Sequence, residues 1–244
     1  MRLRQMRVRH RGTRALAVAV VIAAALTACS ADRSVEAKGL TAAARLAAAR
    51  AKADAATSMH LTLRSSGIPD TANGVLGADG SGTHAPAFKG SLDARIAGFA
   101  AKVDVVAIDS LLYLKLPFTT QFTEADPKAY NAPNPALLFA KEGGITSLMT
   151  ATTNLTEGKA TRTGADILRT ITGKIPGANI VKLLNFGDGA KTFDVTYGIT
   201  DPGGELRSVT LVGPFFKDAT STTATSTYVL TLDRYGAPVE ISKP

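Results

Sequence analysis

The feature that most constrains the fold is a regular alternation of apolar and polar side chains, which recurs in short runs from Met59 onward. In the first run, the apolar residues Met59, Leu61 and Leu63 are each followed by a polar residue. Alternation of this kind predicts half-buried strands, and the Gly- or Asp-rich turns between runs predict antiparallel hairpins. Further runs lie at residues 91–96, 101–107, 112–116, 193–199, 206–212 and 228–233.

Predicted helices lie before and after the first group of runs, which spans residues 59–116. Residues 35–58 contain 11 alanines and one glycine, which predicts a long helix. A stripe of small residues would let it pack closely against a sheet, although a surface helix would show the same pattern. The stripe consists of Leu40, Ala43, Ala47, Ala51 and Ala55.

The middle of the chain is expected to be irregular, because residues 117–135 contain four prolines. Short helices are predicted at 135–141, 145–149, 166–171 and 176–184. The order is therefore helix, meander, irregular helical insertion and second meander. This order predicts the α+β class, with antiparallel strands in both meanders.

The N-terminus has the pattern of a bacterial lipoprotein signal. Six arginines and no acidic residue precede an apolar run at 15–26, which is too short to span a bilayer as a helix. The run ends in Leu26-Thr27-Ala28-Cys29, the small-residue order that precedes a lipidated cysteine. We therefore expect a signal peptide at 1–28, lipid attachment at Cys29, a tether at 29–34 and a single domain at 35–244. An ordinary secretory signal with an accidental cysteine is the alternative.

Removing this leader changes the charge of the protein. The whole chain carries a net charge of +8, and the first 28 residues hold six of its 28 basic residues, which leaves a nearly neutral domain. A nucleic-acid partner is therefore not expected. The single cysteine excludes an intramolecular disulfide. The expected location is the outer face of the cell membrane, held by the lipid on Cys29, because no later segment has the length and hydropathy of a spanning helix.

Groups for catalysis or metal binding are scarce. Beyond the leader there are two histidines, His60 and His84, and neither lies at a metal-ligand spacing. No nucleophile elbow or phosphate-binding loop is present. No catalytic residue, metal or cofactor is predicted, so an enzyme is not expected.

Medium-sized aliphatic residues dominate the predicted inner strand faces, and the chain has no tryptophan. Such a face packs into a filled core or surrounds an apolar space, and periodicity alone leaves both open.

A resemblance favours the second alternative. The order of motifs along the chain resembles the LppX–LprAFG family of mycobacterial lipoproteins, especially its LprF and LprG branches. The matching segments are the lipobox, the Ala-rich helix and residues 58–63, 109–114, 134–138, 143–145, 205–210 and 213–216.

The resemblance implies a strongly curved antiparallel half-barrel with helices on its concave side, enclosing an apolar cavity. The cavity would accept the acyl chains of triacylated glycolipids, such as phosphatidylinositol mannosides, or of triacylglycerol. Leu92 matches a family position near the cavity mouth. The residues expected to line the cavity are Met59, Leu61, Leu63, Leu92, Ala94, Ile96, Ala101, Val103, Val105 and Ala107.

The function implied is a membrane-anchored carrier that shuttles acylated lipid across the envelope, with a major facilitator transporter as a possible partner. The alternative is a non-catalytic scaffold lipoprotein without lipid cargo. Polar residues beside the proline-rich loop are candidates for headgroup contact or simply a solvated loop. They are Lys115, Gln121, Glu124, Asp126 and Lys128. A large empty cavity would cost more than a domain's net stability, so the free protein is expected to be partly collapsed or lipid-loaded.

Overall fold

The computed structural model describes residues 39–244 except 97, 128–131 and 218–222, and only the backbone of residues 96, 217 and 223. The predicted signal peptide, Cys29, the tether and the first residues of the predicted domain lie outside the described residues. Residues 36–244 cluster into one compact unit, and everything below concerns that unit.

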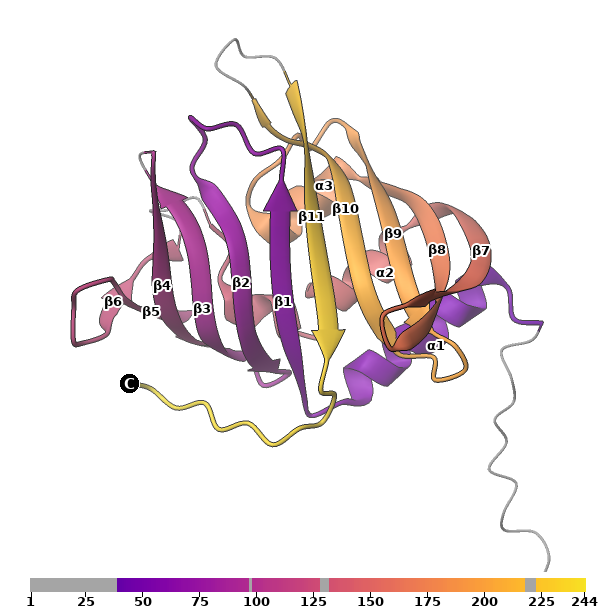
Figure 1. The fold of residues 1–244 in the computed structure, drawn as a ribbon, viewed down its shortest axis with the longest axis horizontal. Coiled ribbons are helices and arrows are strands. Elements are labelled where there is room, and N and C mark those ends of the chain that lie inside the picture. The colour runs from indigo at the N-terminus through magenta and orange to yellow at the C-terminus, as the bar shows by residue number, and fades with distance from the viewer. Residues whose placement is uncertain (1–38, 97, 128–131, 218–222) are drawn as a thin grey trace, which may run out of the picture. The chain divides into compact units, whose positions relative to one another are not determined.

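The described residues form one large curved antiparallel sheet of 11 strands in which every neighbouring pair is antiparallel (Figure 1). The order across the sheet is β6-β5-β4-β3-β2-β1-β11-β10-β9-β8-β7. Two meanders therefore meet where β1 pairs with β11, as the two alternating groups predict. The strands are β1 (Ser58–Ser66), β2 (Gly74–Thr83), β3 (Ala87–Ile96), β4 (Phe99–Ile108), β5 (Leu111–Lys115), β6 (Thr123–Ala125), β7 (Thr153–Thr163), β8 (Asp166–Pro176), β9 (Thr192–Thr200), β10 (Leu206–Lys217) and β11 (Thr223–Asp233).

This strand order forces one connection to cross the whole sheet. β6 and β7 are consecutive in sequence but lie at opposite edges, so residues 126–152 run from one edge to the other. The connection carries η2 (Pro135–Phe139), η3 (Ile145–Ser147) and α2 (Leu148–Ala151). η2 contacts β2, β3 and β4, whereas α2 contacts β8. Figure 1 shows these helices, together with α1 and α3, on a single face of the sheet.

The alanine-rich helix α1 (Ala42–Ala55) is shorter than predicted. It begins after Thr41, whose side-chain oxygen accepts a hydrogen bond from the Ala44 amide, and Gly39 before it has a positive φ of 110°. Of the two interpretations of the alanine stripe, the surface helix is the one observed, because Leu40 and the alanines at 43, 47, 51 and 55 are exposed. The buried side is Arg45, Leu46, Ala49 and Ala53.

Three of the four short helices expected in the second half are confirmed, at η2, at η3 with α2, and at α3 (Gly177–Leu184). The helix expected at 166–171 is wrong, since these residues begin β8. Leu168, Ile171 and Ile175 are buried there, and the β-branched residues of this segment favour a strand. β7 was not predicted, because this edge strand is polar and mostly exposed and so has no alternation.

The two meanders differ in how they are filled. The inner face of the C-terminal meander carries large side chains such as Phe193, Tyr197 and Ile171, all at 0% exposure. Phe193 packs edge-on against Phe215 with ring centroids 4.8 Å apart. Ile180 of α3 is equally buried above them. Around β8 and β9 this half therefore forms a closed core.

Candidate functional site

The inner face of β1–β5 can be described as four rows of side chains, because the antiparallel register aligns equivalent positions across the strands. The rows run from the β1 start toward the β3–β4 hairpin. Row one is Met59, Gly82, Phe88, Ala107 and Leu112; row two is Leu61, Gly80, Gly90, Val105 and Leu114; row three is Leu63, Ala78, Leu92 and Val103; row four is Val75, Ala94 and Ala101.

Two phenylalanine rings fill the space above Gly82 of row one and Gly80 of row two. A Cβ atom on Gly82 would collide with the Phe139 ring from η2, and one on Gly80 would lie 2.5 Å from Cζ of Phe88. The two rings stack with centroids 5.9 Å apart. Glycine is required at these strand positions because the rings lie directly on the backbone. The inner face is therefore closed at these glycines, whereas Leu61, Leu112 and Leu114 of the same two rows still line the pockets described next.

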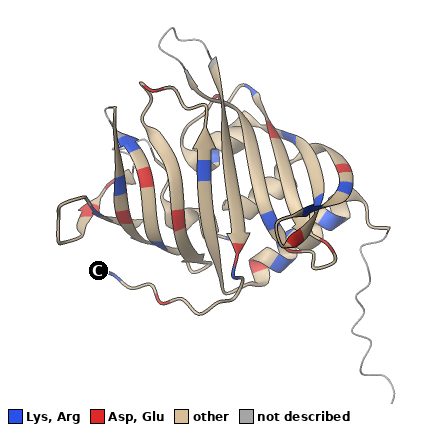
Figure 2. Ribbon diagram, viewed as in Figure 1, with Lys and Arg blue, Asp and Glu red and all other residues tan. Residues whose placement is uncertain are grey.

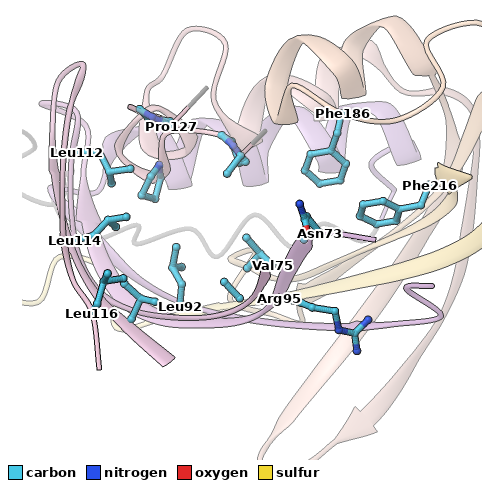
Figure 3. Close-up of a pocket in the computed structure, with 16 residues that line it drawn as sticks. Asn73, Val75, Leu92, Arg95, Leu112, Leu114, Leu116, Pro127, Phe186 and Phe216 are labelled. Atoms are coloured by element: carbon cyan, nitrogen blue, oxygen red, sulfur yellow. The ribbon is translucent and has the colours of Figure 1, made fainter. Parts of the chain in front are cut away.

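Rows three and four lie under open space. Two pockets occur there, with cavity volumes of about 90 Å³ and about 80 Å³. Figure 3 shows Val75, Leu92 and Leu114 projecting from the sheet toward the opposite layer, where Phe186 and Pro127 lie. Six residues line both pockets, so the two are parts of one apolar space. They are Val75, Leu92, Ala132, Pro133, Pro135 and Phe186.

The lining of this space, hereafter the apolar pocket, is almost entirely hydrocarbon. Its polar members are Asn73 and Arg95 in the first part and Tyr228 in the second. The Arg95 guanidinium is engaged elsewhere: Nη1 donates to the Pro69 carbonyl at 3.1 Å, and Nη2 lies 3.4 Å from Oδ1 of Asp70. The pocket therefore favours an uncharged, apolar occupant.

The size of the pocket fits the physical limit on empty cavities. At about 24 cal/mol per Å³, hollows of 80–90 Å³ cost roughly 2 kcal/mol each, which a domain tolerates. A cavity for several acyl chains, on the order of 1,000 Å³, would cost about 24 kcal/mol when empty, more than the 5–15 kcal/mol of a typical domain. Long chains therefore require the layer over the sheet to move outward.

The predicted cavity residues are distributed unevenly over the rows. Leu61, Leu63, Leu92, Ala94 and Val103 line the apolar pocket. Met59, Val105 and Ala107 do not line it, and are buried in the adjoining core. Ala101 packs against that core without lining the pocket. The side chain of Ile96 lies outside what the structure describes.

Several lining residues were not among those predicted. Leu112, Leu114 and Leu116 contribute one wall, and their alternation in the sequence was a usable signal. The opposite wall comes from Pro135, Phe139 and Phe186, which lie in or beside the helices. No periodicity in the sequence identifies these, because they depend on how the crossing connection packs.

The polar residues proposed for headgroup contact lie elsewhere. Lys115 pairs with Asp104 at 2.8 Å, and its ammonium lies 5.5 Å from the centre of the Phe122 ring. Lys115, Gln121, Glu124 and Asp126 do not line the apolar pocket. Lys128 lies outside the described residues.

Both histidines have structural contacts. His60, on the opposite face of β1, lies 2.7 Å from Asp233 of β11 and 3.2 Å from Asp79 of β2, and thus bridges three strands. His84 contacts the carbonyls of Phe139 at 2.6 Å and Ala53 at 3.0 Å. It thereby links η2 to α1.

Within the described part of the chain, no group of His, Cys, Asp and Glu residues is arranged to hold a metal ion. None of the described helices is long and apolar enough to span a membrane. Basic and acidic residues are interspersed over the face of the sheet seen in Figure 2.

Comparisons with known proteins agree with this geometry. The model of the LppX_LprAFG lipoprotein family matches residues 41–241. The crystal structure of LprF from Mycobacterium bovis superposes with a TM-score of 0.67 at 17% identity, covering 83% of this chain and 96% of that one. LppX from Mycobacterium tuberculosis gives a TM-score of 0.59 at 22% identity, covering 82% of this chain and 98% of LppX. No curated relative matches the chain. Because the family model spans most of its length, the chain belongs to the LppX_LprAFG lipoprotein family.

Proposed function

We propose that this protein is a lipid carrier that holds acyl chains in the apolar pocket and moves acylated lipid through the cell envelope. The observation that carries the proposal is the space over rows three and four, which is lined by hydrocarbon and lies between the sheet and the crossing connection. Membership of a lipoprotein family supports it. The curved sheet with helices on its concave side then acts as the receptacle.

The energetics suit a carrier better than a storage protein. Burying three chains of about 16 carbons from water at ~0.8 kcal/mol per methylene gives on the order of 35 kcal/mol, beyond any attainable affinity. In a bilayer these methylenes are already out of water. The free energy of transfer from the bilayer into the protein is therefore a small difference between two large free energies. A nearly balanced exchange lets the protein both load and unload.

The cargo proposed is a triacylated glycolipid or triacylglycerol. The carrier would be attached to the outer face of the cell membrane through Cys29, where two or three acyl chains give stable anchoring. A membrane transporter of the major facilitator class would supply or receive the lipid. The protein would act without chemistry on the cargo, as a carrier and not as an enzyme.

Loading requires the wall opposite the sheet to move. Pro133 and Pro135 of the crossing connection line both parts of the pocket, and so does Phe186 after α3. Displacing this wall enlarges the space without breaking a strand pairing. The sheet then stays constant while the connection adapts to the cargo.

Native mass spectrometry of the Cys29→Ala chain tests the proposal, because this change removes the covalent anchor and leaves only non-covalent lipid. A mass excess that lipid extraction identifies as acylglycerol or glycolipid is expected. A clean mass of the bare chain, even after incubation with such lipids, would favour a scaffold without cargo.

Leu92→Trp localises the binding. Leu92 lines both parts of the pocket, so an indole there should remove most of the bound lipid while the protein stays folded. Val229→Trp is the matched control, since Val229 is 36% exposed on the other face of β11. Equal lipid content in both variants would place the binding site elsewhere.

A further inference from the structure

Among the described residues that line the second part of the apolar pocket, Tyr228 alone carries a hydroxyl group. It lies in β11 and is 3% exposed. Its ring meets Phe215 edge-on with centroids 4.8 Å apart and Phe186 at 6.0 Å. Phe186 lines both parts of the pocket, so Tyr228 stands close to their junction.

The Tyr228 hydroxyl is buried and has no hydrogen-bond partner among the residues that the structure describes. Burial raises the pKa of Tyr228 well above its usual value, so the group stays protonated and remains a donor. A buried donor without an acceptor destabilises the protein. Such groups are rare in folded proteins and call for a functional explanation.

Two other tyrosines, one buried and one partly buried, show the usual arrangement. The Tyr197 hydroxyl lies 2.7 Å from Oγ1 of Thr152, and the Tyr235 hydroxyl donates to the Leu206 carbonyl. Neither Tyr197 nor Tyr235 lines the apolar pocket. The Tyr113 hydroxyl is also buried without a hydrogen-bond partner, but Tyr113 lies outside the pocket and has the Lys243 ammonium 5.4 Å from the centre of its ring. Among the described tyrosines, Tyr228 is thus the one that both lines the pocket and has an unpaired hydroxyl.

We propose that Tyr228 recognises the ester group of the cargo by donating a hydrogen bond to an ester carbonyl oxygen. This inference rests on the proposed lipid-carrier function. An ester carbonyl is a neutral acceptor that enters an apolar space together with its acyl chain. A phosphate is disfavoured, because Arg95, the only charged residue among the described residues that line the pocket, is already paired with Asp70.

This role gives Tyr228 a signature that a structural tyrosine lacks. In the empty protein the hydroxyl stabilises nothing, so Tyr228→Phe should leave the thermal midpoint unchanged or raise it. Tyr197→Phe should lower the midpoint, because a buried hydrogen bond is lost. The Tyr228 change should matter only when an acceptor on the ligand is present.

The test compares trioleoylglycerol with its triether analogue, which has the same chains and lacks the carbonyl groups. Affinities are measured for the whole chain in the Cys29→Ala background by displacement of a fluorescent fatty-acyl probe. We expect a two- to tenfold preference for the ester, roughly the value of one hydrogen bond. Tyr228→Phe should abolish this preference by weakening the ester alone, whereas Tyr197→Phe should retain it.

The outcomes separate the two proposals. Binding of both lipids without a preference, or a preference that survives Tyr228→Phe, would overturn the role of Tyr228 and leave the carrier function standing. A midpoint that falls as far in Tyr228→Phe as in Tyr197→Phe would show that the hydroxyl is already paired, which also overturns it. Binding of neither lipid would overturn both.

Discussion

The two meanders of this sheet share a backbone architecture but differ in what lies on their inner faces. In the C-terminal meander, Phe193 packs over Gly213, and together with Tyr197 and Ile171 it fills the space beneath α3. In the N-terminal meander, Phe139 packs over Gly82 in the same way, but only at one end. Phe216 of β10 and Tyr228 of β11 border rows three and four without filling the space above them, and there the pocket remains. The positions of a few aromatic rings therefore determine which parts of the inner face are filled.

The largest expected effect comes from removing one ring in each half. Phe193→Ala and Phe139→Ala should each lower the free energy of unfolding by about 3–5 kcal/mol, because a buried ring is replaced by a cavity. Denaturant titration checks this. Added triacylglycerol should restore stability to Phe139→Ala, whose cavity extends the pocket, and not to Phe193→Ala. An equal response of both variants would remove the distinction between the halves.

Removing bound lipid should have the next largest effect. A ligand present at 100 times its Kd stabilises a protein by about 2.7 kcal/mol, so delipidation should lower the thermal midpoint by several degrees. Hydrogen exchange before and after delipidation should show the loss of protection in the crossing connection and in β2–β4. Unchanged melting would count against a lipid-filled pocket, and loss of protection confined to β7–β9 would place the lipid away from the apolar pocket.

Weakening α1 should have a smaller effect, restricted to the filled half. Thr41→Ala removes the N-cap hydrogen bond to Ala44, which should cost about 1 kcal/mol. Lipid affinity should stay the same, since α1 contacts β7, β10 and the short helices α2 and η3 and does not line the apolar pocket. Thr41→Ser is the control that keeps the cap. A loss of lipid binding in Thr41→Ala alone would show that the halves are coupled.

The smallest effect is expected on the surface of the filled half. Lys174 of β8 and Asp194 of β9 form an ion pair with both side chains substantially exposed. Such pairs contribute at most about 1 kcal/mol, so Lys174→Ala should barely change either the unfolding midpoint or lipid binding. High salt should have as little effect. A large change would indicate that this face contributes to function.

The sequence predicted the parts of the fold that depend on local periodicity. The two meanders and three of the short helices follow from alternation, prolines and glycines. The start of α1 was mispredicted. The packing side of its alanines stayed open, because tertiary contacts determine the buried side of a uniformly alanine-rich helix. β7 escaped prediction because an edge strand with polar residues on both faces has no alternating signal.

The candidate site was predictable only on its sheet side. Alternation indicates that Met59 and Leu63 share a face, but it does not reveal that Phe139 covers one end of that face. Phe139 and Phe186 come from segments remote in sequence, and their positions follow from the connection that crosses the sheet. The Tyr228 hydroxyl is unpaired because no described neighbour places a hydrogen-bond acceptor beside it, and no local sequence pattern indicates this.

The most direct measurement is photo-crosslinking with a triacylglycerol that carries a diazirine on one acyl chain, followed by peptide mapping. The account predicts labelling around Leu63, Leu92 and Val103 and on the facing segment at Pro133–Phe139, with loss of labelling in Leu92→Trp. Labels concentrated on β7–β9, or on the opposite face of the sheet, would contradict it.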